Sequence, residues 1–317
     1  MTTYLVRDEN AKPSDKYGLR PEERTIAQLR DFGVVVIDKP SGPTSHQVSA
    51  YVQQALGIDK AGHSGTLDPK VTGVLPVATG GATRLVEYML KAGKEYVGVM
   101  HVHQEVPQYE LRKAAQEFVG KITQLPPKRS AVARRLRERS VYAFEFIEIR
   151  TRDILFRADV QAGTYIRKLC SDFGAHLGVG AHMAELRRTR ASHYTEDQSV
   201  TLQTLSDAYA LAQEGDETAF RRIVLPGEDI VKNLKAVVVL DSAVHSLTHG
   251  ATLKVPGVAK VMPGISDGDP VRILTLKDEL VGIGTARMSS KDMMKVKGVA
   301  VKMDKVILSP DVYPRME

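Results

Sequence analysis

Residues 62–77 constrain this chain more than any other stretch, because a loop rich in glycine and threonine runs here into an apolar strand. The three glycines of this stretch allow backbone conformations and close approaches that a Cβ atom would forbid. Its single carboxylate, Asp68, precedes Pro69, which disfavours the helical region and places Asp68 on an extended or turning segment. Loops anchored by a buried strand often display catalytic groups, but Asp-Pro is also an ordinary turn signal. The loop alone leaves Asp68 as either a catalytic residue or a turn residue.

Positive charge is gathered in two places along the 317 residues. The formal net charge of +6 is compatible with a polyanionic partner but does not require one. Each cluster either contacts such a partner or forms a solvated charged face. The first cluster consists of Lys128, Arg129, Arg134, Arg135, Arg137 and Arg139, and the second of Arg187, Arg188 and Arg190.

Cysteine and histidine usage argues against a metal centre. The one cysteine, Cys170, cannot form an intramolecular disulfide or a multi-cysteine metal site. His101 and His103 alternate along a predicted strand, and no neighbouring acid or cysteine completes a ligand set, which favours structural roles. No apolar run is long enough to cross a bilayer and no signal-peptide core is present, so we expect an intracellular, cytoplasmic protein without a metal.

Helical and strand patterns alternate irregularly, which predicts an α+β fold rather than a doubly wound sheet. A helix is expected over 44–56, where Thr44 and Gln47 form a capping box and Gly57 ends the apolar period. Further helices are expected over 109–119 and 164–177, and strands over 33–37, 95–103, 141–149 and 154–160. From 236 onward, short strands separated by Gly, Pro and Asp turns predict a small β-barrel. We therefore divide the chain into a polar extension, 1–32, a main domain, 33–232, and the barrel, 235–311.

Three stretches resemble the signature motifs of the TruB/dyskerin family of RNA pseudouridine synthases. They are residues 62–77, Lys94-Glu95-Tyr96-Val97, and Gly163-Thr164-Tyr165-Ile166-Arg167-Lys168-Leu169. The resemblance implies the pseudouridine synthase fold, in which a mixed, largely antiparallel sheet is flanked by helices. It also implies that Asp68 is the catalytic aspartate of an enzyme that converts uridine in RNA to pseudouridine.

The same resemblance implies roles for the residues around Asp68. Tyr96 would lie against the target base as the candidate for taking the proton from C5, and Arg167 would pair with Asp68. Without the family, Tyr96 is an ordinary packed strand residue and Arg167 a surface charge. The everted nucleotide would be supported by His63, Tyr165 and Leu186. Residues 126–137 resemble a substrate-gripping loop, in which RNA would be contacted by Lys128, Arg129, Arg134, Arg135 and Arg137.

Three features resemble the archaeal dyskerin-type branch rather than the stand-alone bacterial tRNA enzyme: the polar extension, residues 178–190 and the C-terminal module. Within that module, residues 241–244, 249–251 and 282–286 resemble a PUA domain, on which the extension 1–32 is expected to pack. The branch implies a box H/ACA ribonucleoprotein. A guide RNA would select the uridine in rRNA or tRNA, small protein subunits would bind the catalytic domain, and the PUA domain would hold the guide RNA.

The implied reaction is an isomerisation. Uridine is detached at its C1′–N1 bond, turned and rejoined through C5, which requires neither a cofactor nor a metal. Asp68 acts either as a nucleophile towards the sugar or the base, or by removing a sugar proton. A guide-free synthase for the tRNA T-loop is the close alternative, and a non-catalytic RNA-binding scaffold is the alternative from another class. The joint presence of Asp68, Tyr96 and Arg167 argues against the scaffold.

Overall fold

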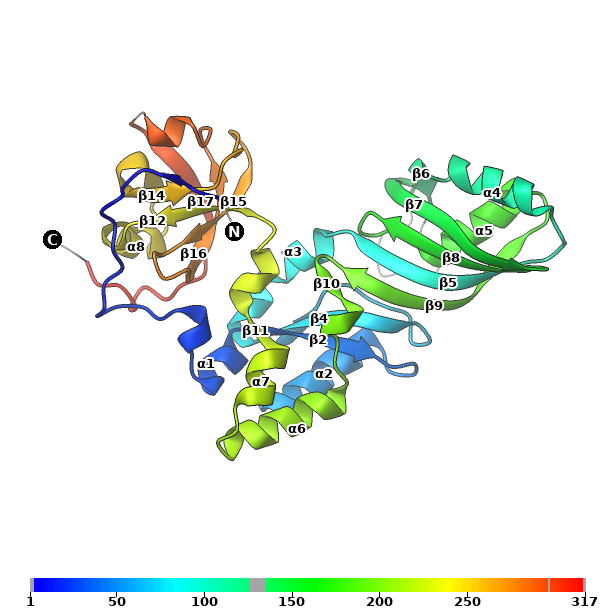
Figure 1. Ribbon diagram of the computed structural model, residues 1–317, viewed down its shortest axis with the longest axis horizontal. Coiled ribbons are helices and arrows are strands. Elements are labelled where there is room, and N and C mark those ends of the chain that lie inside the picture. The colour runs from blue at the N-terminus through cyan, green and yellow to red at the C-terminus, as the bar shows by residue number, and fades with distance from the viewer. Residues whose placement is uncertain (1–2, 126–134, 296, 316–317) are drawn as a thin grey trace. The chain divides into compact units, whose positions relative to one another are not determined.

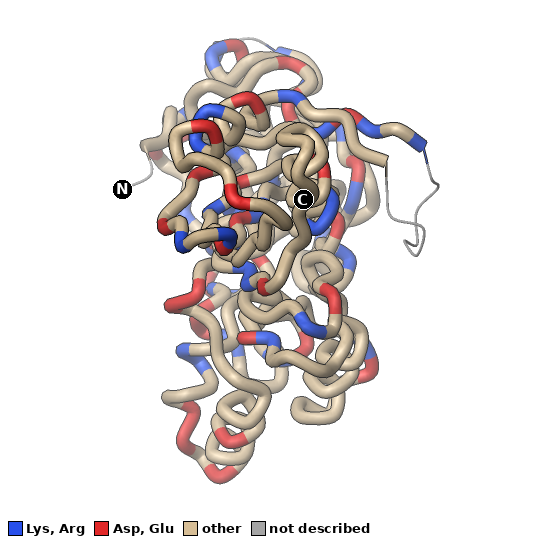
Figure 2. The backbone as a smooth tube through the Cα atoms, turned by 90° about the vertical axis from the view of Figure 1, so that its right-hand side faces the viewer, with Lys and Arg blue, Asp and Glu red and all other residues tan. Residues whose placement is uncertain are grey.

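The structure of the chain, a computed structural model, describes residues 3–125, 135–295 and 297–315 (Figure 1). It divides into two compact units. We call Val34–Leu225 the central unit, and Met1–Gly33 together with Pro226–Glu317 the terminal unit. Acidic and basic residues are interspersed along the described backbone (Figure 2).

A mixed sheet forms the body of the central unit. Among the described residues, its strands follow the order β11-β2-β4-β9-β5-β8-β7-β6, with β3 paired to β4 and β10 paired to β9 (Figure 1). The pair β4–β9 is parallel, whereas β2–β4, β5–β9, β5–β8, β7–β8 and β6–β7 are antiparallel. The strands are β2 (Gly33–Lys39), β3 (Ala61–His63), β4 (Thr72–Thr79), β5 (Lys94–Val102), β6 (Gly120–Gln124), β7 (Arg137–Arg150), β8 (Asp153–Val160), β9 (Ala181–Ala191), β10 (Tyr194–Thr195) and β11 (Val224–Pro226).

Two groups of helices pack on this sheet. Helices α4 (Gln108–Glu117) and α5 (Ile166–His176) lie beside β7 and β9 and share with them an apolar core. Strand β5 presents one face to this core, because every second residue from Lys94 to Val102 is buried. Helices α2 (Ser45–Leu56), α6 (Leu202–Gln213) and α7 (Thr218–Ile223) gather near β2 and β4, and α3 (Val86–Lys91) precedes β5 (Figure 1).

The terminal unit is built on a second sheet, which among the described residues has the order β1-β14-β12-β15-β16-β17-β13. Its first strand comes from the N-terminal extension, where Leu5 and Val6 pair with Val261 and Lys260. The Lys277 ammonium also donates hydrogen bonds to the carbonyl oxygens of Tyr17 and Gly18, at 2.8 and 3.0 Å. The elements are β1 (Leu5–Val6), α1 (Ile26–Asp31), β12 (Lys235–Val239), α8 (Asp241–Thr248), β13 (Leu253–Lys254), β14 (Val258–Val261), β15 (Pro270–Leu274), β16 (Leu280–Ala286) and β17 (Val299–Val306). Short 3₁₀ helices in the two units are η1 (Pro21–Glu23), η2 (Gly80–Leu85), η3 (Glu196–Gln198), η4 (Gly227–Val231), η5 (Val255–Gly257) and η6 (Asp292–Met294).

The predicted α+β class, with a mixed sheet and a smaller β module, is confirmed. The helix expected over 44–56 is α2, and its predicted capping box is present, because the Thr44 hydroxyl accepts from the Gln47 N–H and the Gln47 side chain accepts from the Thr44 N–H. The helices expected over 109–119 and 164–177 are α4 and α5. Helix α4 begins one residue earlier than expected and ends two earlier, and α5 begins two residues later and ends one earlier.

Strand β9 is an element that the sequence patterns did not predict, and it carries the second basic cluster. Arg187 forms a two-point ion pair with Asp38, at 2.9 and 3.2 Å, and Arg190 pairs with Asp159 at 2.7 Å. Arg188 is buried inside the central unit. Arg188 is therefore not part of a solvated face, whereas Arg187 and Arg190 are partly exposed and paired with carboxylates.

Candidate active site

Asp68 lies in the loop between β3 and β4, as a turn residue whose carbonyl oxygen accepts a hydrogen bond from the Val71 N–H at 2.9 Å. Its side chain is 50% exposed, and one carboxylate oxygen contacts the guanidinium of Arg167, the second residue of α5. Arg167 is 58% exposed. An ion pair this exposed contributes little to stability. It does fix the direction in which the carboxylate points, since Arg is a planar donor.

The backbone on both sides of Asp68 is held by two buried residues that the sequence analysis did not single out. The Ser45 hydroxyl accepts from the Leu67 N–H at 2.8 Å and lies 3.3 Å from the Leu67 carbonyl oxygen, to which it donates. The Lys39 ammonium donates to the carbonyl oxygens of Pro40, Pro69 and Val71 at 2.9 to 3.0 Å. Apart from the Lys39–Pro40 bond, these contacts cross 22 to 32 residues of sequence, so no local pattern marks them.

Tyr96 is 8% exposed on β5 and belongs to the same apolar cluster as Leu67, Val71 and Ile166, the neighbours of Asp68 and Arg167 in the chain. Its partner on β9 is Arg188, which is 1% exposed. The Arg188 guanidinium donates to the carbonyl oxygen of Val74 at 2.7 Å and to that of Gly65 at 3.3 and 3.4 Å. Burial lowers the pKa of Arg188, and the adjacent Tyr96 hydroxyl opposes that fall. Arg188 thus joins the tyrosine strand to the loop that carries Asp68.

His63 and Lys94 occupy the buried side of the same loop. His63 Nδ1 accepts from the Gly65 N–H at 3.2 Å, and its ring meets the His46 ring edge-on, 4.7 Å between centroids. Burial, followed by His46 and Arg188, lowers the pKa of His63 to about 4. The Lys94 ammonium donates to the carbonyl oxygens at the end of α3 at 2.7 to 3.0 Å. Burial and then Arg188 lower the pKa of Lys94 to about 7.

His63→Gln is expected to remove a loss of stability at acid pH. In the unfolded chain His63 titrates near its ordinary value of 6.5, whereas in the folded chain its pKa is about 4. Between these values the unfolded state binds a proton that the folded state lacks, so the free energy of unfolding falls as the pH falls, by at most about 3 kcal/mol. Urea unfolding at pH 7 and pH 4.5 should show a smaller fall in the variant than in wild type or in a control, His249→Gln. Equal falls in all three proteins would contradict the lowered pKa of His63.

The other predicted site residues are placed as follows. Tyr165 immediately precedes α5, and Leu186 lies on β9 opposite Gly98, where a Cβ atom would come within 2.7 Å of the leucine Cδ1. Leu186 packs on the same apolar cluster as Tyr96. The structure thus brings Asp68 and Arg167 into contact and gathers Tyr96 and Leu186 around the core beneath them.

Two of the five predicted RNA-contacting residues, Arg135 and Arg137, lie among the described residues. Arg135 is exposed, and Arg137 is half-buried at the start of β7, opposite Gln124. Lys128, Arg129 and Arg134 lie outside the described residues. The structure places neither Arg135 nor Arg137 in contact with Asp68 among the hydrogen bonds and ion pairs described for that residue.

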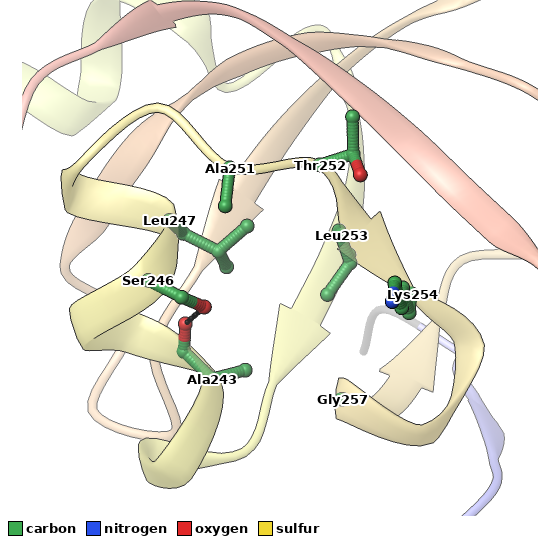
Figure 3. A pocket seen from close by; sticks show the side chains of 8 residues that line it. All are labelled: Ala243, Ser246, Leu247, Ala251, Thr252, Leu253, Lys254 and Gly257. Carbon is green, nitrogen blue, oxygen red and sulfur yellow. Dashed lines mark hydrogen bonds between the residues drawn. The ribbon is translucent and has the colours of Figure 1, made fainter. Parts of the chain in front are cut away.

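The terminal unit contains a cavity of about 340 Å³ between α8 and β13 (Figure 3). Apolar side chains from both elements line its walls, and Lys254 is the positively charged residue among those that line it. Ser246 donates to the Ala243 carbonyl oxygen at 2.9 Å across one turn of α8. The cavity is lined by Ala243, Ser246, Leu247, Ala251, Thr252, Leu253, Lys254 and Gly257.

Histidine contacts correct one detail of the sequence analysis. Asp153 does lie beside His101, 2.6 Å from its Nδ1, and His182 Nδ1 lies 3.0 Å from His103 Nε2. Over the part of the chain that the structure describes, however, no group of three or more His, Cys, Asp or Glu residues is arranged to hold a metal ion. The same residues include no helix that is long and apolar enough to cross a membrane.

Family profiles match nearly the whole chain. Residues 53–166 match the TruB family pseudouridylate synthase N-terminal domain, and residues 167–232 match the tRNA pseudouridylate synthase B C-terminal domain. Residues 235–307 match the PUA domain, and residues 1–49 match the DKCLD domain.

Curated relatives and solved structures agree with these profiles. The probable tRNA pseudouridine synthase B of Pyrococcus furiosus is 52% identical over 98% of this chain and 93% of its own length. That of Nanoarchaeum equitans is 50% identical over 97% of this chain and 89% of its own length.

Among solved structures, a chain of a Cbf5-Nop10-Gar1 complex is 50% identical, with a TM-score of 0.91 over 100% of this chain and 97% of that one. A chain of an H/ACA ribonucleoprotein bound to a substrate RNA containing 2′-deoxyuridine is 48% identical, with a TM-score of 0.91 over 99% and 97% of the two chains. This chain therefore belongs to the TruB/dyskerin family of RNA pseudouridine synthases, in its archaeal dyskerin-type branch with a C-terminal PUA domain.

Proposed function

We propose that this protein isomerises specific uridines in RNA to pseudouridine, with Asp68 as the catalytic residue. The observation that carries the proposal is the Asp68–Arg167 pair, which holds an exposed carboxylate in a fixed direction above a buried, aromatic-lined core. A planar guanidinium donor aligns the carboxylate that it contacts. Such a group is suited to attack, or to take a proton from, a nucleotide that enters from solvent.

The reaction must break the C1′–N1 bond, turn the uracil and form a C1′–C5 bond, after which C5 loses its proton and N1 gains one. Asp68 either forms a bond to the nucleotide or removes a sugar proton in the first half. We assign the removal of the C5 proton to Tyr96. Tyr96 pairs with Arg188 across the β5–β9 strand pair, and Arg188 donates to Gly65 in the loop that carries Asp68. The uridine has to leave its stack, at a cost of a few kcal/mol. Stacking on Tyr96 or Tyr165 and packing against Leu186 and His63 offset that cost.

We assign the protein to a ribonucleoprotein in which a guide RNA selects the target. Support comes from the two solved structures, one described with Nop10 and Gar1 and the other as an H/ACA ribonucleoprotein with substrate RNA. Small protein subunits, guide RNA and substrate rRNA or tRNA are the partners that this implies. The cavity between α8 and β13, with Lys254 at its edge, is the site we assign to the guide RNA, because an apolar wall can pack against a base and a lysine ammonium can donate to a phosphate oxygen. We place this activity in the cytoplasm.

A second candidate function is guide-free modification of the tRNA T-loop. The curated relatives are called probable tRNA pseudouridine synthase B, which favours this substrate directly. The two functions use the same Asp68 and differ in how the substrate is chosen.

Tritium release from RNA labelled at uridine C5 tests the proposal. Wild type, Asp68→Asn and the matched control Asp267→Asn would each receive T-loop tRNA alone, and target RNA with guide RNA and partner subunits. We expect release from wild type and from the control, strongest in the guided reaction, and none from Asp68→Asn. Equal release from unguided tRNA would favour the second function. Tight RNA binding by wild type without release on either substrate would leave only the scaffold.

A further inference from the structure

Gln124, the last residue of β6, is 2% exposed, and its carboxamide is bound to the backbone of Tyr165. Its Oε1 accepts from the Tyr165 N–H at 3.0 Å, and its Nε2 donates to the Tyr165 carbonyl oxygen at 3.2 Å. The two bonds define the orientation of the amide. If its oxygen and nitrogen were exchanged, a donor would face the Tyr165 N–H and an acceptor would face the Tyr165 carbonyl oxygen. The Gln124 amide thus pairs with both backbone groups of Tyr165, as a residue of a neighbouring strand would.

The bound residue stands at the start of the helix that carries Arg167. Tyr165 is the N-cap of α5, with extended φ and ψ of −94° and 105°, and its side chain makes no capping hydrogen bond. Its carbonyl oxygen also accepts from the Leu169 N–H at 2.9 Å, the first bond of the helix. Gln124 therefore holds the residue from which α5 begins, two positions before the guanidinium that contacts Asp68.

A second glutamine fixes the other end of the same turn. Gln161 Oε1 accepts from the Ser140 N–H at 2.9 Å, and the Ser140 carbonyl oxygen accepts from the Gln161 N–H at 2.8 Å. Ser140 lies on β7, which pairs with β6. Between these two fixed points the turn includes Gly163, with φ of +79°, a conformation that favours glycine. The β6–β7 pair thus frames the turn that presents Tyr165 and Arg167.

We propose that Gln124 is a positioning residue for the isomerisation: it sets the start of α5 so that Tyr165 and Arg167 stay aligned with Asp68. This inference rests on the proposed function. Gln124 does not touch the carboxylate, so its removal should misplace the Asp68–Arg167 pair without removing any group that contacts RNA. Misplacing a reacting group by about 1 Å costs as much as about 100-fold in rate.

Gln124→Leu and Gln124→Glu test the proposal in the full complex, with Gln203→Leu, an exposed residue of α6, as the matched control. We expect Gln124→Leu to lower kcat about 10- to 100-fold, with KM for the RNA within about twofold of wild type. Gln203→Leu should match wild type. The ionised side chain of Gln124→Glu keeps the acceptor for the Tyr165 N–H but opposes the carbonyl oxygen, whereas the protonated acid can donate to it. The kcat of Gln124→Glu, relative to wild type, should therefore rise as the pH falls.

A kcat for Gln124→Leu within twofold of wild type, or a Gln124→Glu pH profile parallel to that of wild type, would overturn the proposal. If Gln124→Leu does not fold, the pH dependence of kcat in Gln124→Glu tests the proposal by itself. If wild type itself releases no tritium, the proposed function fails, and crystal structures of wild type and Gln124→Glu at two pH values decide the positioning role. An unchanged Asp68–Arg167 contact in the ionised variant would refute it, and a displaced Arg167 would support it.

Discussion

Asp68→Asn is expected to lower kcat for pseudouridine formation by at least about 10⁴-fold while changing the free energy of unfolding by less than about 1 kcal/mol. The two effects separate because the Asp68 and Arg167 side chains are 50% and 58% exposed. Water solvates both charges when the pair is broken, so the fold loses little. The amide of Asn cannot act as a nucleophile or as a base, so the chemical step loses its reacting group.

Single-turnover measurements with enzyme in excess would give the rate, and urea unfolding would give the stability. Asp267→Asn, the same change at an exposed position of the terminal unit, should match wild type in both. A rate loss that follows a loss of folded protein would contradict the catalytic assignment of Asp68. So would a variant that keeps more than about a hundredth of the wild-type rate.

Gly73→Ala is expected to destabilise the central unit by at least about 4 kcal/mol. Gly73 has φ of +103°, and a Cβ atom there would lie 2.2 Å from the Arg188 carbonyl oxygen and 2.9 Å from the Arg188 nitrogen. Those are backbone atoms of β9, so the parallel pairing between β4 and β9 would have to open. Arg188 would then leave its place beneath Gly65, and activity should fall along with stability.

Gly120→Ala is the matched control for this substitution. Gly120 has nearly the same φ, +107°, but nothing lies within 4 Å of its would-be Cβ atom. Gly120→Ala should therefore cost only the backbone strain of a positive φ, about 1–2 kcal/mol. Thermal and urea unfolding of both variants would separate strain from collision. Equal destabilisation by the two alanines would contradict the expected collision between a Cβ atom at position 73 and the Arg188 backbone.

The sequence predicts the elements whose signals are local. The capping box of Thr44 and Gln47 marks the start of α2, and strict alternation marks β5, because helix starts and half-buried strands depend on near neighbours. The three family motifs indicate Asp68, Tyr96 and Arg167 as one site, and the structure brings Asp68 and Arg167 into contact. The roles of these residues stay predictions until they are measured.

The rest depends on contacts that no local pattern carries. Strand β9 contains three arginines in four positions and resembles a surface segment. Yet Arg187 pairs with Asp38 of β2 and Glu196 of η3, and Arg190 pairs with Asp159 of β8. Ser45, Lys39 and Gln124 bind main-chain atoms 22 to 41 residues away. A serine in the first turn of a helix, a lysine before a proline and a glutamine at the end of a strand are each common in sequences, so their part in the site emerges only from the fold.

The pairing of β1 with β14 has a consequence for the order in which the protein can be made. Val6 and its partner Lys260 are separated by 254 residues, so a ribosome needs about 10–50 s to deliver the second after the first. During that interval the central unit, which is continuous from Val34 to Leu225, is completed and free to fold by itself. The N-terminal segment must wait with its strand unpaired until β14 emerges. Synthesis therefore delivers the central unit first, and the terminal unit, whose two segments flank it in the sequence, is completed last.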